Sequence, residues 1–275
     1  SGSNIGCSVM ISQLFGAKEY GRMKTAISTS LISAMSLSLL LTLVGFLTGK
    51  PLLRLLNTPG NILADAELYL NIYIGGLAFL FLYNICTGIF TALGDSKTPL
   101  YFLIGSSVAN IIMDLIFVIC FHMGVGGVAW ATFLCQGVAS ILAFLALLRR
   151  LRTFEETEYR RFSGRMLLNI SLIAIPSILQ QSFISVGNLF VQGLVNGYGS
   201  DVLAGYSAAI KLNTFATMGI STLGNGLSSY TAQNIGGGKQ ERVKDGYKAS
   251  MLMMLCVVIP FTLVYLLFGP QMMNL

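Results

Sequence analysis

The segments SVMISQLFGAKEYGRMK (Ser8–Lys24) and SSYTAQNIGGGKQERVK (Ser228–Lys244) align without a gap at an offset of 220 residues. Each reads as the end of a helix, a Gln-x-x-Gly motif and a basic loop, and an apolar run follows each. The shared positions include Gln13/Gln233, Gly16/Gly236 and Arg22/Arg242. Two apolar segments often have identical residues at aligned positions by chance, but identical residues in a polar loop are harder to explain by chance. We therefore interpret the two segments as copies of an internal repeat.

The repeat sets the expected architecture of the whole protein. Six helix starts separate the two copies, and an even number gives both copies the same orientation across a membrane. Such parallel repeats are related by an axis along the membrane normal. We expect two six-helix halves and about 440 residues, twice the offset between the copies. The chain lacks an initiator Met and opens as if inside a helix, so we expect a fragment. It would hold one 220-residue repeat unit and about a quarter of the next.

The composition is that of a membrane protein. Hydrophobic residues make up 54% of the 275 residues and charged residues 10%, against roughly 25% charged residues in soluble domains. The net charge of +6 comes from short basic clusters between apolar runs, which does not favour nucleic-acid binding. The cysteines show no CxxC or Cys/His spacing, which excludes the usual zinc motifs and a disulfide framework.

Seven apolar runs are long enough to cross a bilayer, which takes about 20 residues. They lie at about Ala26–Thr48, Leu68–Leu93, Thr98–Phe121, Val125–Leu148, Met166–Asn196, Val202–Ile235 and Ala249–Phe268, after a helix end at Ser3–Phe15. With alternating loops, fourteen of the seventeen Lys and Arg fall on one side, two on the other, and Lys211 lies within a helix. The positive-inside rule makes the richer side cytoplasmic.

A charged connector, RRLRTFEETEYRRFSGR (Arg149–Arg165), divides the chain. We expect an amino-terminal lobe over residues 1–150, a cytoplasmic linker over 151–165 and the start of a carboxy-terminal lobe over 166–275. The fold class that follows is an all-α polytopic membrane protein.

Asp114, in SSVANIIMDLIFVICF (Ser106–Phe121), is the clearest candidate functional residue, because acids inside a bilayer are costly. It lies about 24 Å along its helix from the cytoplasmic end, at the predicted level of Thr132 and Tyr69. Asn110, four residues earlier, shares its helix face. A carboxylate, an amide oxygen and two hydroxyls suit a proton or a hard monovalent cation such as Na⁺. The alternative is a purely structural hydrogen-bond cluster.

Lys211 is the second charged residue within an apolar run. Three alternative roles fit Lys211: it faces a substrate cavity, it pairs with an acid on an absent helix, or it extends to the membrane interface. Gln180, Gln181 and Asn188 line the same cavity or form hydrogen bonds between helices. No Ser/His pair, HExxH motif or paired carboxylates occur, so the sequence does not predict an enzyme and implies no cofactor.

Several stretches resemble multidrug and toxic compound extrusion (MATE) transporters. They are SQLFGAKEYGRMKTA, TAQNIGGGKQERVKDG, TALGDSKTP, GVGGVAWATFLCQG and IPSILQQSFISVGNLFVQGLVNGYGSDVLAGYSAAIKL. The resemblance covers essentially the whole chain. It implies an incomplete twelve-helix fold of two six-helix lobes, from the end of helix 2 to most of helix 9.

The resemblance also implies a site and an activity. One branch of the family holds a cation with an Asp of helix 1, a Tyr of helix 4, an Asn-x-x-x-Asp of helix 5 and a Thr of helix 6. In this chain the resemblance places Tyr69 at the helix 4 position, Asn110 and Asp114 at the helix 5 positions, and Thr132 at the helix 6 position. The helix 1 Asp would precede Ser1. Another branch uses a Glu on helix 7, and this chain has none there.

The implied function is efflux of amphipathic, often cationic, small molecules in exchange for H⁺ or Na⁺ by alternating access. We expect a multi-pass monomer in a bacterial inner membrane, surrounded by lipid. A lipid-linked oligosaccharide flippase of the same superfamily and a membrane scaffold without transport activity are the alternatives.

Overall fold

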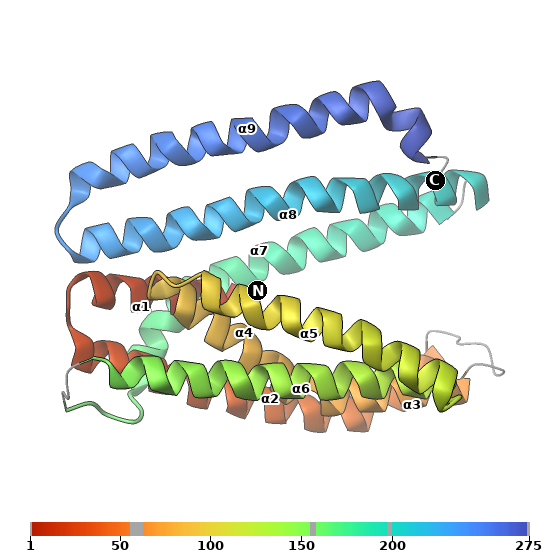
Figure 1. The fold of residues 1–275 in the computed structure, drawn as a ribbon, viewed down its shortest axis with the longest axis horizontal. Coiled ribbons are helices and arrows are strands. Elements are labelled where there is room, and N and C mark those ends of the chain that lie inside the picture. The colour runs from red at the N-terminus through yellow and green to blue at the C-terminus, as the bar shows by residue number, and fades with distance from the viewer. Residues whose placement is uncertain (1, 56–62, 155–157, 197–199, 274–275) are drawn as a thin grey trace. The chain divides into compact units, whose positions relative to one another are not determined.

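The computed structural model describes residues 2–55, 63–154, 158–196 and 200–273, and it is helical with no strand in these ranges. The helices can be followed in Figure 1. They are α1 (Gly2–Gly16), α2 (Tyr20–Leu55), α3 (Leu63–Gly75), α4 (Leu77–Ala92), α5 (Lys97–Leu115), the π-helical turn η1 (Ile116–Cys120), α6 (Gly124–Arg152), α7 (Gly164–Asn196), α8 (Ser200–Gly236) and α9 (Gln240–Met273). The predicted all-α fold is confirmed.

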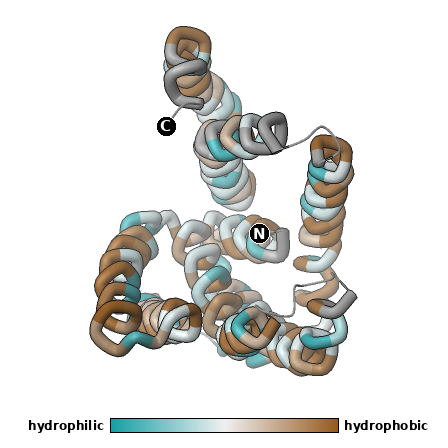
Figure 2. Tube along the Cα trace, turned by 90° about the vertical axis from the view of Figure 1, so that its right-hand side faces the viewer, coloured by the Kyte–Doolittle hydropathy of each residue, from teal (hydrophilic) through white to brown (hydrophobic). Residues whose placement is uncertain are grey.

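The described helices are those of an integral multi-pass membrane protein. Five are long and apolar enough to cross a membrane, and a sixth crossing follows if the bent pair α3–α4 is one span. Large apolar side chains lie exposed along them, as Leu103, Ile111 and Ile112 do on α5, and Figure 2 shows hydrophobic residues along most of the helices. Exposed apolar surface of this extent fits a lipid environment. The helix α8, predicted to be a span, is long enough to cross a membrane but is less apolar than these five helices.

The predicted continuous helix over Leu68–Leu93 is instead broken between α3 and α4. The two helices meet at an angle of 43° at Gly75–Gly76. Paired glycines are a recognised cause of helix kinks. A Cβ added at Gly76 would lie 3.3 Å from the Phe133 ring, so the absent side chain also lets this corner approach α6.

The chain forms two compact units, and Tyr20–Asn169 is one of them. In this unit α4 and α5 both pack against α6, and α2 packs against α3 and α4. The side of α6 that is buried carries small residues, among them Ala131, Ala139, Ser140 and Ala143. Small residues let membrane helices approach closely. On α2, Gly45 and Gly49 serve the same purpose, because a Cβ there would lie 3.0 Å and 3.2 Å from α3 side chains.

The other unit contains Ser1–Glu19 and Ile170–Leu275. Here α1 crosses α8, and the crossing is symmetric in the repeat. A Cβ on Gly16 would overlap the Gln233 carbonyl oxygen at 1.9 Å, and one on Gly236 would overlap the Gln13 carbonyl at 2.0 Å. Each Gly of one copy therefore packs on the Gln backbone of the other. The two lobes predicted over residues 1–150 and 166–275 divide the chain in sequence order, and they stay a prediction.

The ends of α1 and α8 show the repeat in atomic detail. Lys18 and Gly238 both have positive φ, +59° and +68°. The Glu19 amide donates to the Leu14 carbonyl at 3.0 Å, and the equivalent Lys239 amide donates to Asn234 at 2.7 Å. A left-handed residue with a backbone bond spanning five residues is the Schellman helix end. The two copies thus share a turn as well as a sequence pattern.

Candidate functional site

Asn110 and Asp114 lie one turn apart in the second half of α5, which packs along α6. The Asn110 Nδ2 donates to the Thr132 Oγ1 at 3.5 Å. Both side chains are half-buried. The structure therefore brings together two of the residues that the sequence placed at one level.

Asp114 is half-buried, and its Oδ1 is enclosed without a hydrogen-bond partner among the described residues. Cys135 of α6 lies near enough to interact with it electrostatically. Most buried polar atoms in proteins are hydrogen-bonded, so an enclosed carboxylate oxygen without a partner calls for an explanation. A proton on the carboxyl or a cation beside it would supply one.

The backbone changes form immediately after Asp114. Residues Ile116–Cys120 make a π-helical turn, in which the Phe121 amide donates to the Ile116 carbonyl at 3.1 Å. The following His122 is exposed with a φ of +52°. Wide π turns inside helices occur frequently at functional sites. Nothing in the sequence pattern distinguished this turn from a regular helix.

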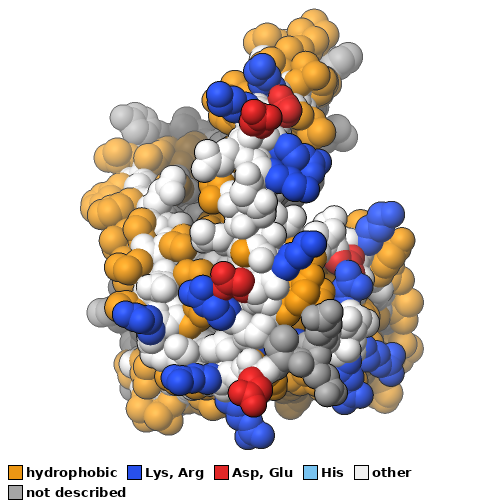
Figure 3. Space-filling model, turned by 90° about the vertical axis from the view of Figure 1, so that its left-hand side faces the viewer, with side chains coloured by type: hydrophobic (Ala, Val, Ile, Leu, Met, Phe, Trp, Pro, Cys, Tyr) orange, Lys and Arg blue, Asp and Glu red, His pale blue; other side chains and the backbone are white. Residues whose placement is uncertain are grey.

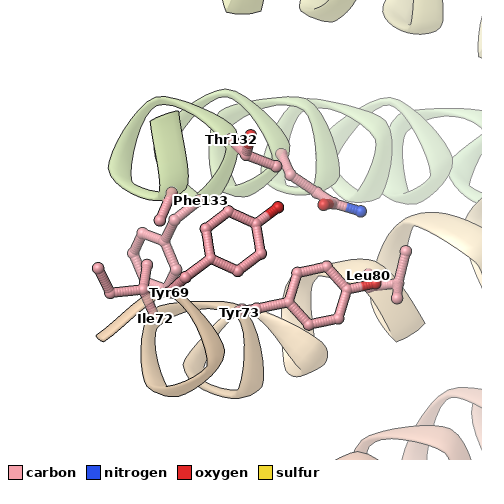
Figure 4. A pocket seen from close by; sticks show the side chains of 9 residues that line it. Tyr69, Ile72, Tyr73, Leu80, Thr132 and Phe133 are labelled. Carbon is pink, nitrogen blue, oxygen red and sulfur yellow. The ribbon is translucent and has the colours of Figure 1, made fainter. Parts of the chain in front are cut away.

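Tyr69 and Thr132 line a small cavity between α3, α4 and α6. Its volume is about 10 Å³, which is room for roughly one water-sized particle. Figure 4 shows the Tyr69 ring extending from α3 toward α6, with Thr132 on the facing helix. The residues around the cavity are Tyr69, Ile72, Tyr73, Gly76, Leu80, Ala129, Thr132, Phe133 and Gln136.

Thr132 belongs to both parts of the site. Its hydroxyl accepts the Asn110 bond, and its side chain lines the cavity together with Tyr69. Tyr73 and Gln136 also line this cavity, and the sequence reasoning missed both. Each lies four residues after a predicted site residue, Tyr69 or Thr132, so helical spacing could have found them.

The predicted cavity residues of the second lobe have a different setting. Gln180, Gln181 and Asn188 on α7 and Lys211 on α8 are all exposed. Their assignment to a substrate cavity stays a prediction. The described residues also contain no group of three or more His, Cys, Asp or Glu that could hold a metal ion.

Comparison with known proteins gives the family. The MatE family model matches residues 1–116 and 176–275. The chain is 33% identical over 243 residues to the probable multidrug resistance protein YpnP of Bacillus subtilis, covering 88% of this chain and 54% of YpnP. It is 29% identical over 252 residues to the probable multidrug resistance protein YoeA of the same organism, again covering 88% of this chain and 54% of the relative.

The fold is also similar to that of solved MATE structures. A solved structure of MATE in complex with MaD5 superposes with a TM-score of 0.89 at 22% identity, covering 98% of this chain and 62% of that chain. The described helices define a polytopic, all-helical membrane protein. The chain belongs to the MatE family, and it spans about half the length of the curated relatives it matches.

Proposed function

We propose that the protein containing this chain exports amphipathic, often cationic, small molecules in exchange for H⁺ or Na⁺. The observation that carries the proposal is the enclosed Asp114 Oδ1, one helical turn from the Asn110–Thr132 contact. Multidrug resistance is the activity named for the relatives YpnP and YoeA. An ionisable residue within a membrane helix is the expected position for a coupling ion.

The proposed coupling acts through α5 and α6. A proton or Na⁺ at Asp114 would neutralise the carboxylate, with the oxygens of Asn110 and Thr132 as further ligands for Na⁺. Tyr69 would contribute its hydroxyl beside Thr132. An ion shifts a conformational equilibrium only by binding one state more tightly than another. The π turn after Asp114 offers a backbone segment that changes between helix types when the carboxylate is neutralised.

The proposed orientation follows from the basic loops. Lys24, Lys97, the arginines of the linker and Lys239 would face the cytoplasm of a bacterium. The protein would work by alternating access, as a monomer in the inner membrane.

The test uses the full-length protein in proteoliposomes with a fluorescent cationic dye. Asp114→Asn is expected to abolish dye transport driven by a pH or Na⁺ gradient, while dye binding persists. The control is Asp245→Asn, which removes an exposed acid of α9. Unchanged gradient-driven transport by Asp114→Asn would overturn the site. Absence of flux in the wild-type protein under both gradients would overturn the antiporter and favour a scaffold.

A further inference from the structure

The charged linker between α6 and α7 contacts the first turns of α2. Within the described part of the linker, residues 158–163 make most of these contacts, and we call this segment the strap. Figure 3 shows the face of this unit where α2 begins and α6 ends, and many Lys and Arg side chains lie there among hydrophobic ones. A charged linker ordinarily extends into water. Specific contacts between the strap and a membrane helix therefore indicate a role beyond connecting two helices.

Two buried threonines of α2 bind the backbone of the strap. The Thr25 Oγ1 accepts a hydrogen bond from the Arg160 amide at 3.1 Å, and the Thr29 Oγ1 accepts one from the Ser163 amide at 3.1 Å. The Thr25 hydroxyl donates its own proton to the Gly21 carbonyl at 3.0 Å, which leaves its lone pairs for the strap. Both threonines are buried, with Thr29 fully so. Water therefore has little access to these hydroxyls.

Two further bonds lie on the same side of α2. The Ser28 hydroxyl donates to the Arg161 carbonyl at 2.6 Å, and the Lys24 Nζ donates to the Phe154 carbonyl at 3.4 Å. The Phe154 ring also lies 5.2 Å from the Tyr20 ring, measured between centroids. The partners follow the same order along both segments, so the strap runs parallel to α2 in a fixed register.

Ser163 joins α2 to the start of α7. Its amide donates to Thr29, while its hydroxyl accepts a bond from the Met166 amide at 3.4 Å and its carbonyl accepts one from the Leu167 amide at 2.9 Å. A serine whose oxygens accept bonds from the first turn is an N-cap, which stabilises the beginning of a helix. The residue that caps α7 is therefore itself held by α2.

The hydroxyls that bind the strap are absent from the second copy of the repeat. At the offset of 220 residues, the positions equivalent to the two threonines and Ser28 hold Asp245, Ala249 and Lys248 of α9. None of these side chains carries a hydroxyl. The attachment is therefore a specialised feature of the first copy and does not follow from the repeat.

We propose that the strap stays bound to α2 throughout transport, so that α2 and the first turn of α7 move as one body. Motions between parts of a protein are absorbed by a few hinge residues, and in this proposal those residues lie outside the strap. The register of the bonds supports this, because the strap cannot slide along α2 without losing every partner. The reference to transport rests on the proposed function, whereas the attachment itself does not.

Hydrogen exchange measured by mass spectrometry on the full-length protein in detergent tests the attachment. A peptide that covers residues 160–163 is expected to exchange slowly, and equally with and without Na⁺ or a cationic dye. Thr25→Val/Thr29→Val removes both acceptors and should speed this exchange about tenfold. The control Thr48→Val changes a threonine of the same helix that donates to the Val44 carbonyl, and it should leave the peptide unchanged. Equal exchange in the double variant and the control would overturn the attachment.

A cross-link tests whether the strap stays in place during transport. In a full-length background without native cysteines, Ser28→Cys/Arg161→Cys is joined by a short, reducible bifunctional thiol reagent. Dye transport is expected to be the same before and after cross-linking. Transport that falls on cross-linking and returns on reduction would show that the strap leaves α2, and the proposal would be wrong. A wild-type protein without flux under either gradient contradicts the proposed function instead, and the exchange experiment with Na⁺ and dye still decides whether the strap is released.

Discussion

The Ser8 and Ser229 hydroxyl oxygens lie 2.9 Å apart in a buried hydrogen bond between α1 and α8. The bond belongs to a crossing in which Gly16 and Gly236 pack on equivalent backbone positions of the opposite copy. By sequence, α1 belongs to the first copy of the repeat and α8 ends in the second. This crossing therefore joins equivalent helix ends of the two copies.

Replacing both serines with cysteine should allow the crossing to be locked. In a full-length background without native cysteines, Ser8→Cys/Ser229→Cys is expected to form a disulfide on mild oxidation, because the side chains are already in contact. Gradient-driven transport should fall when the disulfide forms and return on reduction. Mobility on gels with and without reductant measures the bond, and each single variant is the control. Failure to oxidise would contradict the contact.

Gly236→Ala is expected to destabilise the protein by about 1–3 kcal/mol, because the new methyl group would overlap the Gln13 carbonyl. The matched control is Gly224→Ala on the same helix, where an added Cβ meets no atom within 4 Å. That change should be neutral or slightly stabilising, since Ala favours a helix over Gly. Thermal unfolding in detergent compares the two variants, and equal unfolding temperatures would contradict close packing at Gly236.

Lys18→Gly is expected to stabilise the protein by about 1 kcal/mol. Lys18 adopts a φ of +59°, a conformation that costs a residue with a Cβ roughly 1–2 kcal/mol, and Gly occupies the matching position 238. Thermal unfolding measures the change. The control Glu19→Gly alters the next residue, which has no positive φ, and should not stabilise. A lower unfolding temperature for Lys18→Gly would contradict this account of the turn.

Asp95, in the loop before α5, should make stability depend on acid pH. Partial burial raises the pKa of its carboxyl, but the hydrogen bonds from the Thr98 hydroxyl and amide and the nearby Arg150 charge outweigh burial, so the pKa lies below its ordinary 3.8. A lowered pKa means stabilisation that is present above pH 3.8 and lost as the pH falls through the folded-state value.

Asp95→Asn should therefore lower stability at neutral pH and reduce the loss of stability below about pH 4. Unfolding temperatures from pH 3 to 7 measure the difference between the variant and the wild type. Thr98→Val removes only the hydroxyl partner and should produce a smaller effect in the same direction. A constant difference across this pH range would show that the charge of Asp95 contributes nothing.

Local signals in the sequence determined the helical fold, the repeat, the placement of Asn110 and Asp114 on one helix face, and the level shared by Tyr69 and Thr132. Hydrophobic run length, helical rise and loop charge act within one segment at a time, so they can be read without knowing the neighbours.

Only the tertiary structure decided the break at Gly75–Gly76, the π turn after Asp114, and the hydrogen bonds that join the linker to α2. The break and the linker contacts each depend on two segments far apart in the chain approaching within a few ångströms. A glycine pair permits a bend, but the packing of Phe133 against it makes the bend favourable, and that contact is absent from any single segment of the sequence.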